Sequence, residues 1–339
     1  MSFARSTFPR TISAFASAIL LLTVLSVSYP SLVVADSVSA QGDSNALAHD
    51  GQQSVLSMTS HLATEADIDA LKARLGVRQP GETYEPVVVD GFGTGISPRS
   101  EADWQGLVGQ MVVYEVVALP TELSGAFDLS GEPEFPTVGD QAAQGSCSAW
   151  AATYYSYGYL EAVDNAWTEA SQGNSSQLLS PAWTYNMVNG GRDQGSWVDT
   201  NMMVVRDWGA ASMAAMPYDD DDPTSWGSPE AFREASLHRA SEVGYIDYSP
   251  STTVDSIKAL VAAGTPVAFA MDANEFTSGF SDGNYVISSA EYSSTSLNHA
   301  QTIVGYDDSL SDDGDSGAFR VVNSWGADWG DSGYYWLTY

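Results

Sequence analysis

The sequence is poor in basic residues. Only 12 lysines and arginines stand against 43 aspartates and glutamates, so the chain of 339 residues has a formal net charge of −31. Such a surface repels the phosphates of nucleic acids and of anionic membranes, and we expect neither as a partner. The excess of acid fits the solubility of an exported protein or an adaptation to high salt, and the composition leaves both interpretations open.

Cysteine is almost absent as well. Cys147 is the only one, so the chain cannot form a disulfide within itself. A lone thiol in an exported protein is an intermolecular linker, an inert buried side chain or a nucleophile. Residues 139–146 are rich in glycine and glutamine, and the aromatic run at residues 148–163 predicts a helix with the thiol in its first turn. Amide dipoles at a helix start favour the reactive thiolate, so we interpret Cys147 as a nucleophile.

Long hydrophobic runs are missing except near the N-terminus. Two arginines precede an apolar core at residues 14–27, and small residues ending at Ala35 or Ala40 follow it. This pattern predicts a cleaved export signal over residues 1–35, a secreted protein and no stable membrane association after cleavage. The alternative is an uncleaved anchor, but the core is short for a membrane span and Pro30 follows it.

The remaining chain divides into a leader, a helical part and a β-rich part. Residues 36–60 are rich in Ser, Gln, Asp and Ala, which predicts a flexible segment. We expect helices at residues 64–75, 148–163, 177–188, 200–208, 229–240 and 254–263. We expect strands at residues 87–89, 108–119, 266–271, 285–287, 300–306, 318–322 and 333–338. The change from helices to strands predicts two subdomains with a cleft between them.

A glycine-rich run in the leader resembles a nucleotide-binding motif. Residues 91–95 (Gly-Phe-Gly-Thr-Gly) follow a short apolar strand. A phosphate-binding loop of this kind opens a helix, and no helical pattern follows here. We therefore reject a nucleotide site.

A cysteine nucleophile needs a base to take its proton. Of four histidines, His49 and His61 lie in the leader and His238 lies on a charged helix. His299 opens an apolar strand, whose end can hold the ring rigidly toward a cleft. Taken alone, His299 also fits a purely structural histidine.

A second apolar strand ends at a polar residue that can orient this base. Asn323 follows residues 319–322 and lies beside Trp325 and Trp329. Its amide oxygen can accept a hydrogen bond from an imidazole N–H and hold the ring, while the indoles shield the pair from water.

Together these stretches resemble the papain-like cysteine proteases. The pattern Asn-Ser-Trp-Gly-x-x-Trp-Gly-x-x-Gly-Tyr at residues 323–334 is the most specific signal. The resemblance covers about residues 120–339 and implies roles for four residues in the family's order. Gln141 is the implied oxyanion-hole donor, Cys147 the nucleophile, His299 the general base and Asn323 the residue that orients it. Gln144 is a rival for the role of Gln141.

The resemblance also implies residues that bind substrate. A glycine-rich strand pairs with the substrate backbone in the family, and counting back from the third helix favours Gly195 and Ser196 over Gly190 and Gly191. The Asn298 carbonyl is expected to face the substrate at the scissile bond, and we assign Trp325 to the same surface.

The chain departs from the family pattern at two places. The usual Cys-Gly-Ser-Cys-Trp is here Gln144-Gly-Ser-Cys-Ser148, and the family's disulfide cysteines are missing, which puts no catalytic residue in doubt. Asn323 also lies further along the chain than expected, and we attribute this to an inserted acidic loop at residues 307–317. Residues 307–315 of that loop carry several carboxylates that could bind calcium, but their spacing fits no EF-hand and a solvated acidic loop is the favoured interpretation.

From the resemblance we expect an α+β, papain-like fold, with a helical subdomain, a β-barrel-like subdomain and a cleft between them. Residues 122–339 form the protease domain, and residues 36–121 form a leader that serves as propeptide. The implied reaction is hydrolysis of a peptide or protein substrate through a thioester acyl-enzyme, by a monomer, with no cofactor and no metal. Two alternatives remain. A transglutaminase-like acyltransferase usually has Asp in the place of Asn323, and a non-catalytic binding homologue typically lacks the cysteine or the histidine.

Overall fold

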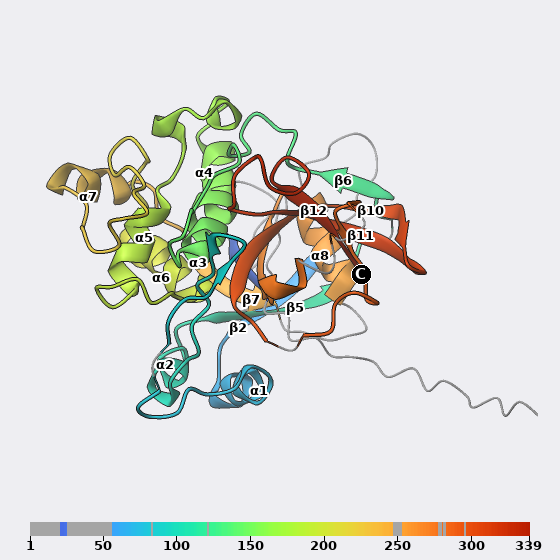
Figure 1. Ribbon diagram of the computed structural model, residues 1–339, viewed down its shortest axis with the longest axis horizontal. Helices are drawn as coiled ribbons and strands as arrows, with labels where there is room; N and C mark the ends of the chain where they lie inside the picture. The colour runs from blue at the N-terminus through green and yellow to red at the C-terminus, as the bar shows by residue number, and fades with distance from the viewer. Residues whose placement is uncertain are drawn as a thin grey trace, which may run out of the picture.

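The structure, a computed structural model, describes residues 21–25, 56–82, 84–120, 122–246, 253–276, 280, 283–294 and 296–339. Most helices gather on one side of the molecule and the strands on the other, with the leader helices below both (Figure 1). The predicted α+β class is therefore confirmed. Within the described residues, no helix is long and apolar enough to cross a membrane.

The helical side is built around the helix that follows the lone cysteine. This helix begins as α3 (Cys147–Ala149), continues for eight residues as a π-helix (Trp150–Tyr157) and ends as α4 (Gly158–Asp164). Every residue of the π-helical part is buried, so the whole circumference packs against the protein. The other helices of this side are α5 (Pro181–Val188), α6 (Val198–Trp208) and α7 (Pro229–Ala235), whereas α8 (Thr253–Ala262) packs against the strands (Figure 1).

Two local signals set the ends of these helices as expected. Pro181 occupies the first position of α5, where its missing N–H would have no partner in the helix anyway. Gly209 ends α6 with a φ of 83°, a conformation that glycine adopts without strain.

Ten of the described strands form one open sheet rather than a closed barrel, in the order β2-β5-β7-β1-β8-β10-β11-β12-β9, with β6 paired to β10. The strands of the C-terminal half are β7 (Glu242–Ile246), β8 (Val267–Met271), β9 (Val286–Ile287), β10 (His299–Asp312), β11 (Asp315–Val322) and β12 (Tyr334–Thr338). The others are β1 (Leu21–Leu25), β2 (Ser57–Leu62), β5 (Val112–Ala118) and β6 (Ala126–Asp128).

The acidic segment at residues 307–317 is not a loop. It extends β10 and β11 into a long antiparallel hairpin that turns at Asp313 and Gly314. Both turn residues have positive φ, 47° and 95°, which suits the twist of a tight hairpin. The prediction of an irregular insertion was wrong because these strands expose their acidic side chains and show no apolar alternation.

The described leader residues pack as a further layer on residues 122–339, which we call the catalytic part because of the expected site. Its helix α1 (Glu65–Leu75) starts at the N-cap Thr64, whose side chain and Asp67 form a capping box. The strand β5 joins the sheet by pairing parallel to β7, and β2 pairs with β5. Since β2 includes residues 57–60, the prediction of a flexible segment was wrong there. Residues 36–55 lie outside the described residues.

The remaining leader elements lead toward the cysteine. A hairpin of β3 (Val88–Val89) and β4 (Phe92–Gly93) is followed by the short helix α2 (Glu101–Gln105). Trp104 of α2 and Ile68 of α1 belong to the same buried apolar cluster as Cys147.

The expected export signal overlaps one strand. Residues 21–25 form β1 between β7 and β8, whereas residues 1–20 and 26–35 lie outside the described residues. Removal of a signal over residues 1–35 would take β1 out of the sheet and leave β7 and β8 without their shared neighbour.

Candidate active site

The lone thiol lies at the junction of the helical and β-rich parts. Cys147 is the first residue of α3 and is fully buried. Its Sγ accepts hydrogen bonds from the backbone N–H of Ala300, at 3.4 Å, and from that of Gly95 in the leader. The first contact comes from the residue after His299, so the start of β10 lies against the sulfur.

His299 is held by the amide that the sequence singled out. Its Nε2 lies 2.7 Å from Asn323 Oδ1, which also accepts a hydrogen bond from the N–H of Ser324. The Trp325 ring covers the imidazole, with 4.7 Å between the ring centroids. Within the described part of the chain, His299 Nδ1 is buried and has no hydrogen-bond partner. This ring nitrogen is therefore available to take a proton.

The two glutamines near the cysteine point in different directions. Gln141 Nε2 donates to the leader carbonyl of Gly93 at 2.9 Å, and its Oε1 accepts from Ser324 Oγ at 2.6 Å. Gln144 instead donates to the carbonyl oxygens of Asp219 and Asp220. Of the two glutamines, Gln141 is thus the one whose side chain contacts the leader segment over Cys147.

The expected substrate-binding residues also meet at this place, and the leader occupies it. The Asn298 carbonyl accepts hydrogen bonds from the N–H groups of Gly95 and Ile96, both at 2.9 Å. Ser196 donates its N–H to the Gly95 carbonyl at 2.8 Å, and Ile96 forms a parallel β-bridge with Ser196. Gly195, beside it, has a φ of 77°. Leader residues 93–96 therefore lie on Cys147 as a chain clamped from both sides.

Trp325 contacts the same leader segment. Its ring stacks on that of Phe92, with 5.1 Å between the centroids and 9° between the planes. Its Nε1 donates to the Gly93 carbonyl at 3.3 Å, which Gln141 also contacts. The Gly93 carbonyl is thus held by two side-chain donors from the catalytic part.

The close approach of the leader requires glycine. A Cβ on Gly93 would lie 2.4 Å from the Gln144 carbonyl oxygen, and one on Gly95 would lie 1.9 Å from the Gly145 carbonyl oxygen. Both distances are far below van der Waals contact, and the atoms met are backbone atoms that cannot rotate away. We rejected residues 91–95 as a nucleotide-binding loop. Glycines of this run instead allow the leader backbone to lie close to residues 144 and 145 beside Cys147, and no local sequence pattern predicts this role.

Burial under the leader keeps the two reactive groups uncharged. It raises the pKa of the Cys147 thiol to about 11, although the amides of Ala300 and Gly95 act in the opposite direction. Burial lowers the pKa of His299 to about 4, against the raising effect of Asn323. The leader-covered site thus holds a neutral thiol and a neutral imidazole.

The low pKa of His299 predicts that acid loosens the leader. A solvated imidazole titrates near its ordinary value of 6.5, so the covered form has its full stability above that pH and loses it as the pH falls toward 4. Between pH 7 and pH 5 we expect the covered form to lose about 2 kcal/mol relative to the open form. Limited proteolysis of the leader across this range measures the change, and a cleavage rate independent of pH would contradict it.

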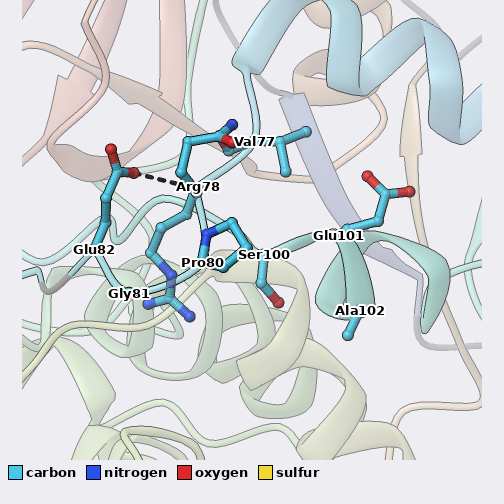
Figure 2. Close-up of a pocket in the computed structure, with 9 residues that line it drawn as sticks. Val77, Arg78, Pro80, Gly81, Glu82, Ser100, Glu101 and Ala102 are labelled. Atoms are coloured by element: carbon cyan, nitrogen blue, oxygen red, sulfur yellow. Dashed lines mark hydrogen bonds between the residues drawn. The ribbon is translucent and has the colours of Figure 1, made fainter.

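Two other features lie apart from this site. An open pocket of about 580 Å³ is lined by leader residues alone (Figure 2). Three carboxylates, those of Glu291, Asp312 and Asp313, lie close together near the end of the β10–β11 hairpin. The Asp312 and Asp313 carboxylates also accept hydrogen bonds from Asn284 and Ser288, and the cluster alone does not establish the calcium site considered for residues 307–315.

Comparison with known proteins gives consistent results. The family model of the papain family cysteine proteases matches residues 124–339. A cathepsin L-like peptidase of Aedes aegypti is 31% identical over 202 residues, which cover 58% of this chain and 53% of that protein. Procathepsin L of Mus musculus is 30% identical over 173 residues, which cover 51% of this chain and 43% of that protein. The matched part thus spans about half the length of these relatives.

A solved structure shows the same fold. The digestive procathepsin L2 of Tenebrio molitor superimposes with a TM-score of 0.50 and 23% sequence identity, over 80% of this chain and 74% of that one. At this identity the likeness concerns the fold alone.

Proposed function

Because the chain belongs to the papain family of cysteine proteases, we propose that it hydrolyses peptide bonds in peptide or protein substrates through a thioester acyl-enzyme. Cys147 is the proposed nucleophile, His299 the general base and acid, and Asn323 the residue that orients the imidazole. The observation that carries the proposal is the set of contacts around residue 93. The Gly93 carbonyl accepts from Gln141 Nε2 beside Cys147, as the carbonyl of a scissile bond would.

The proposed reaction follows from these groups. His299 takes the thiol proton, and the thiolate adds to the substrate carbonyl carbon. Gln141 Nε2 and the Cys147 N–H stabilise the negative charge that forms on the carbonyl oxygen. The imidazolium then protonates the leaving amine, and the neutral imidazole activates a water molecule that hydrolyses the thioester and frees the thiol.

Analysis of the products separates hydrolysis from acyl transfer. The activated protein is incubated with a peptide library in ¹⁸O-labelled water that also contains a primary amine at millimolar concentration. We expect one ¹⁸O atom in each new carboxyl terminus because water resolves the thioester. Amides of the added amine as the main product would support the transglutaminase-like alternative. The absence of any cleavage, with the library intact, would support the binding homologue.

We further propose that residues 36–121 are an inhibitory propeptide. The support is the path of residues 93–96, which fill the positions where a substrate would meet Cys147, Asn298 and Ser196. The chain hydrogen-bonded there presents Gly95 to the sulfur through its N–H and not through a carbonyl. The Gly95 carbonyl is instead held by the N–H of Ser196.

Export is part of the same proposal, since the N-terminal pattern is that of a signal peptide. We expect the secreted protein to begin after Ala35 or Ala40. N-terminal sequencing of the protein recovered from the medium tests this. A secreted chain that still begins before Leu21 would overturn it and would favour β1 as a permanent strand of the sheet.

A further inference from the structure

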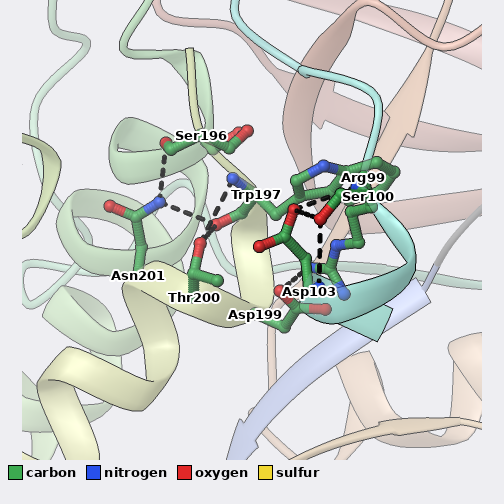
Figure 3. Close-up of polar contacts among 9 residues, drawn as sticks. Arg99, Ser100, Asp103, Ser196, Trp197, Asp199, Thr200 and Asn201 are labelled. Carbon is green, nitrogen blue, oxygen red and sulfur yellow. Dashed lines mark hydrogen bonds and ion pairs between the residues drawn. The ribbon is translucent and has the colours of Figure 1, made fainter. Parts of the chain in front are cut away.

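A leader arginine enters the catalytic part beside the cleft. Arg99 is 2% exposed, and its guanidinium donates to the carboxylate of Asp199, which is 4% exposed. Figure 3 shows the pair between the leader turn and the start of α6. The guanidinium carbon lies 4.4 Å from the ring centre of Trp197 and 4.8 Å from that of Trp104. A cation thus lies against two indole rings and donates a hydrogen bond to an acid.

Two of the three groups that hold this cation remain when the leader leaves. Trp197 is the N-cap of α6 and Asp199 lies in its first turn, whereas Trp104 belongs to the leader helix α2. The hydrogen bond that the structure gives the Asp199 carboxylate is the one to Arg99. Loss of the leader therefore leaves a carboxylate and an indole face without the cation that fills them.

This place continues the surface that binds the chain over Cys147. Ser196, the residue directly before Trp197, donates its N–H to the Gly95 carbonyl and pairs with Ile96. Arg99 follows Ile96 by three positions along the leader. A peptide clamped on Ser196 in the place of the leader would thus bring a side chain within about six residues of the reacting bond to Asp199 and Trp197.

We propose that Trp197 and Asp199 form a subsite that binds the guanidinium of a substrate arginine, with Arg99 occupying it in the precursor. The proposal rests on the proposed peptidase function. A guanidinium is preferred over an ammonium because its flat face stacks on the indole while its edge donates to the carboxylate. Lysine supplies a point charge without that plane, so arginine is bound more tightly than lysine.

Matched peptide substrates test the subsite in the activated wild-type protein. The peptides differ only in carrying arginine, lysine or the neutral isostere citrulline at each position within six residues of the scissile bond. At one of these positions we expect kcat/KM to be at least ten times higher for arginine than for citrulline, with lysine in between. Equal values for arginine and citrulline at every position would overturn the proposal and leave Arg99 as a latch for the leader only.

Two variants locate the preference. Asp199→Asn is expected to reduce the ratio of arginine to citrulline to less than twofold. Asp207→Asn, which changes an acid near the end of the same helix, is the matched control and keeps the ratio of the wild type. A preference that persists in the Asp199→Asn variant would place the subsite elsewhere and contradict the assignment.

A binding measurement separates the subsite from the catalytic claim. In the full chain with Arg99→Ala, calorimetry compares argininamide with citrullinamide. We expect argininamide to bind at least ten times more tightly, and we expect this difference to vanish when Asp199→Asn is added. Selective binding of argininamide, together with no peptide hydrolysis by the activated wild-type protein, would support the subsite and refute the proposed peptidase function. Hydrolysis with no arginine selectivity in either experiment would refute the subsite alone.

Discussion

Replacing Cys147 with alanine is expected to lower peptide hydrolysis by the activated protein about 10⁴-fold or more. Removal of the nucleophile leaves only the contribution of substrate binding and of the oxyanion donors. The change removes one sulfur atom from a buried position, so the fold should persist. Hydrolysis of a fluorogenic peptide, with the melting temperature measured in parallel, gives the result.

A serine in the same helix provides the control. Ser156 is buried in the π-helical segment, and its Oγ has no hydrogen-bond partner among the described residues. Ser156→Ala is therefore expected to keep the activity of the wild type. Activity in the Cys147→Ala variant close to that of this control would remove Cys147 from the mechanism and with it the proposed acyl-enzyme.

The second large effect is expected in the leader. Gly95→Ala introduces a methyl group whose carbon would lie 1.9 Å from the Gly145 carbonyl oxygen, so the leader must shift off the sulfur. Forcing extra volume into a packed site costs about 1–3 kcal/mol. We therefore expect the basal peptidase activity of the full chain to rise about 5- to 150-fold over that of the unaltered precursor.

Another leader glycine tests whether the rise is specific. A Cβ on Gly106 would meet its nearest neighbours at 3.4 and 3.5 Å, which is ordinary contact, and its φ of −62° suits alanine. Gly106→Ala should leave the precursor as inactive as before. An equal rise in both variants would indicate general loosening of the leader and not release of residues 93–96 from the cleft.

The residues of the proposed catalytic group could be predicted from the sequence because each lies in a short pattern of its own. Cys147 follows a glycine-rich turn at a helix start, and His299 and Asn323 each stand at the end of an apolar strand. The family resemblance supplied their order, and the structure brings these residues together with Gln141. Such patterns are local, so a single sequence is enough to recognise them.

The contacts between leader and cleft could not be found in this way. Gly95 meets Ser196 and Asn298, and Arg99 meets Asp199, at separations of about a hundred residues or more. No periodicity records such pairings. The π-helical segment could not be predicted for another reason. A helix that is buried on all sides has no apolar stripe, so its sequence does not indicate the number of residues per turn.

The leader contacts also connect the regulation of the site with its specificity. Residues 93–96 cover the sulfur through backbone hydrogen bonds, whereas Arg99 anchors the same segment through its side chain. Breaking a buried ion pair from one side costs about 3–5 kcal/mol because the remaining charge stays buried. In this proposal the arginine anchors the precursor and is the model for the substrate side chain that replaces it.

The most direct test of the central claim is the alkylation rate of Cys147 before and after removal of the leader in one sample. Iodoacetamide modification is followed by mass spectrometry at pH 7, together with peptide hydrolysis. The account predicts slow alkylation and little hydrolysis in the full chain, and a parallel rise of both when the leader is cleaved and released. Equal alkylation rates before and after cleavage would contradict the claim that residues 93–96 cover the nucleophile.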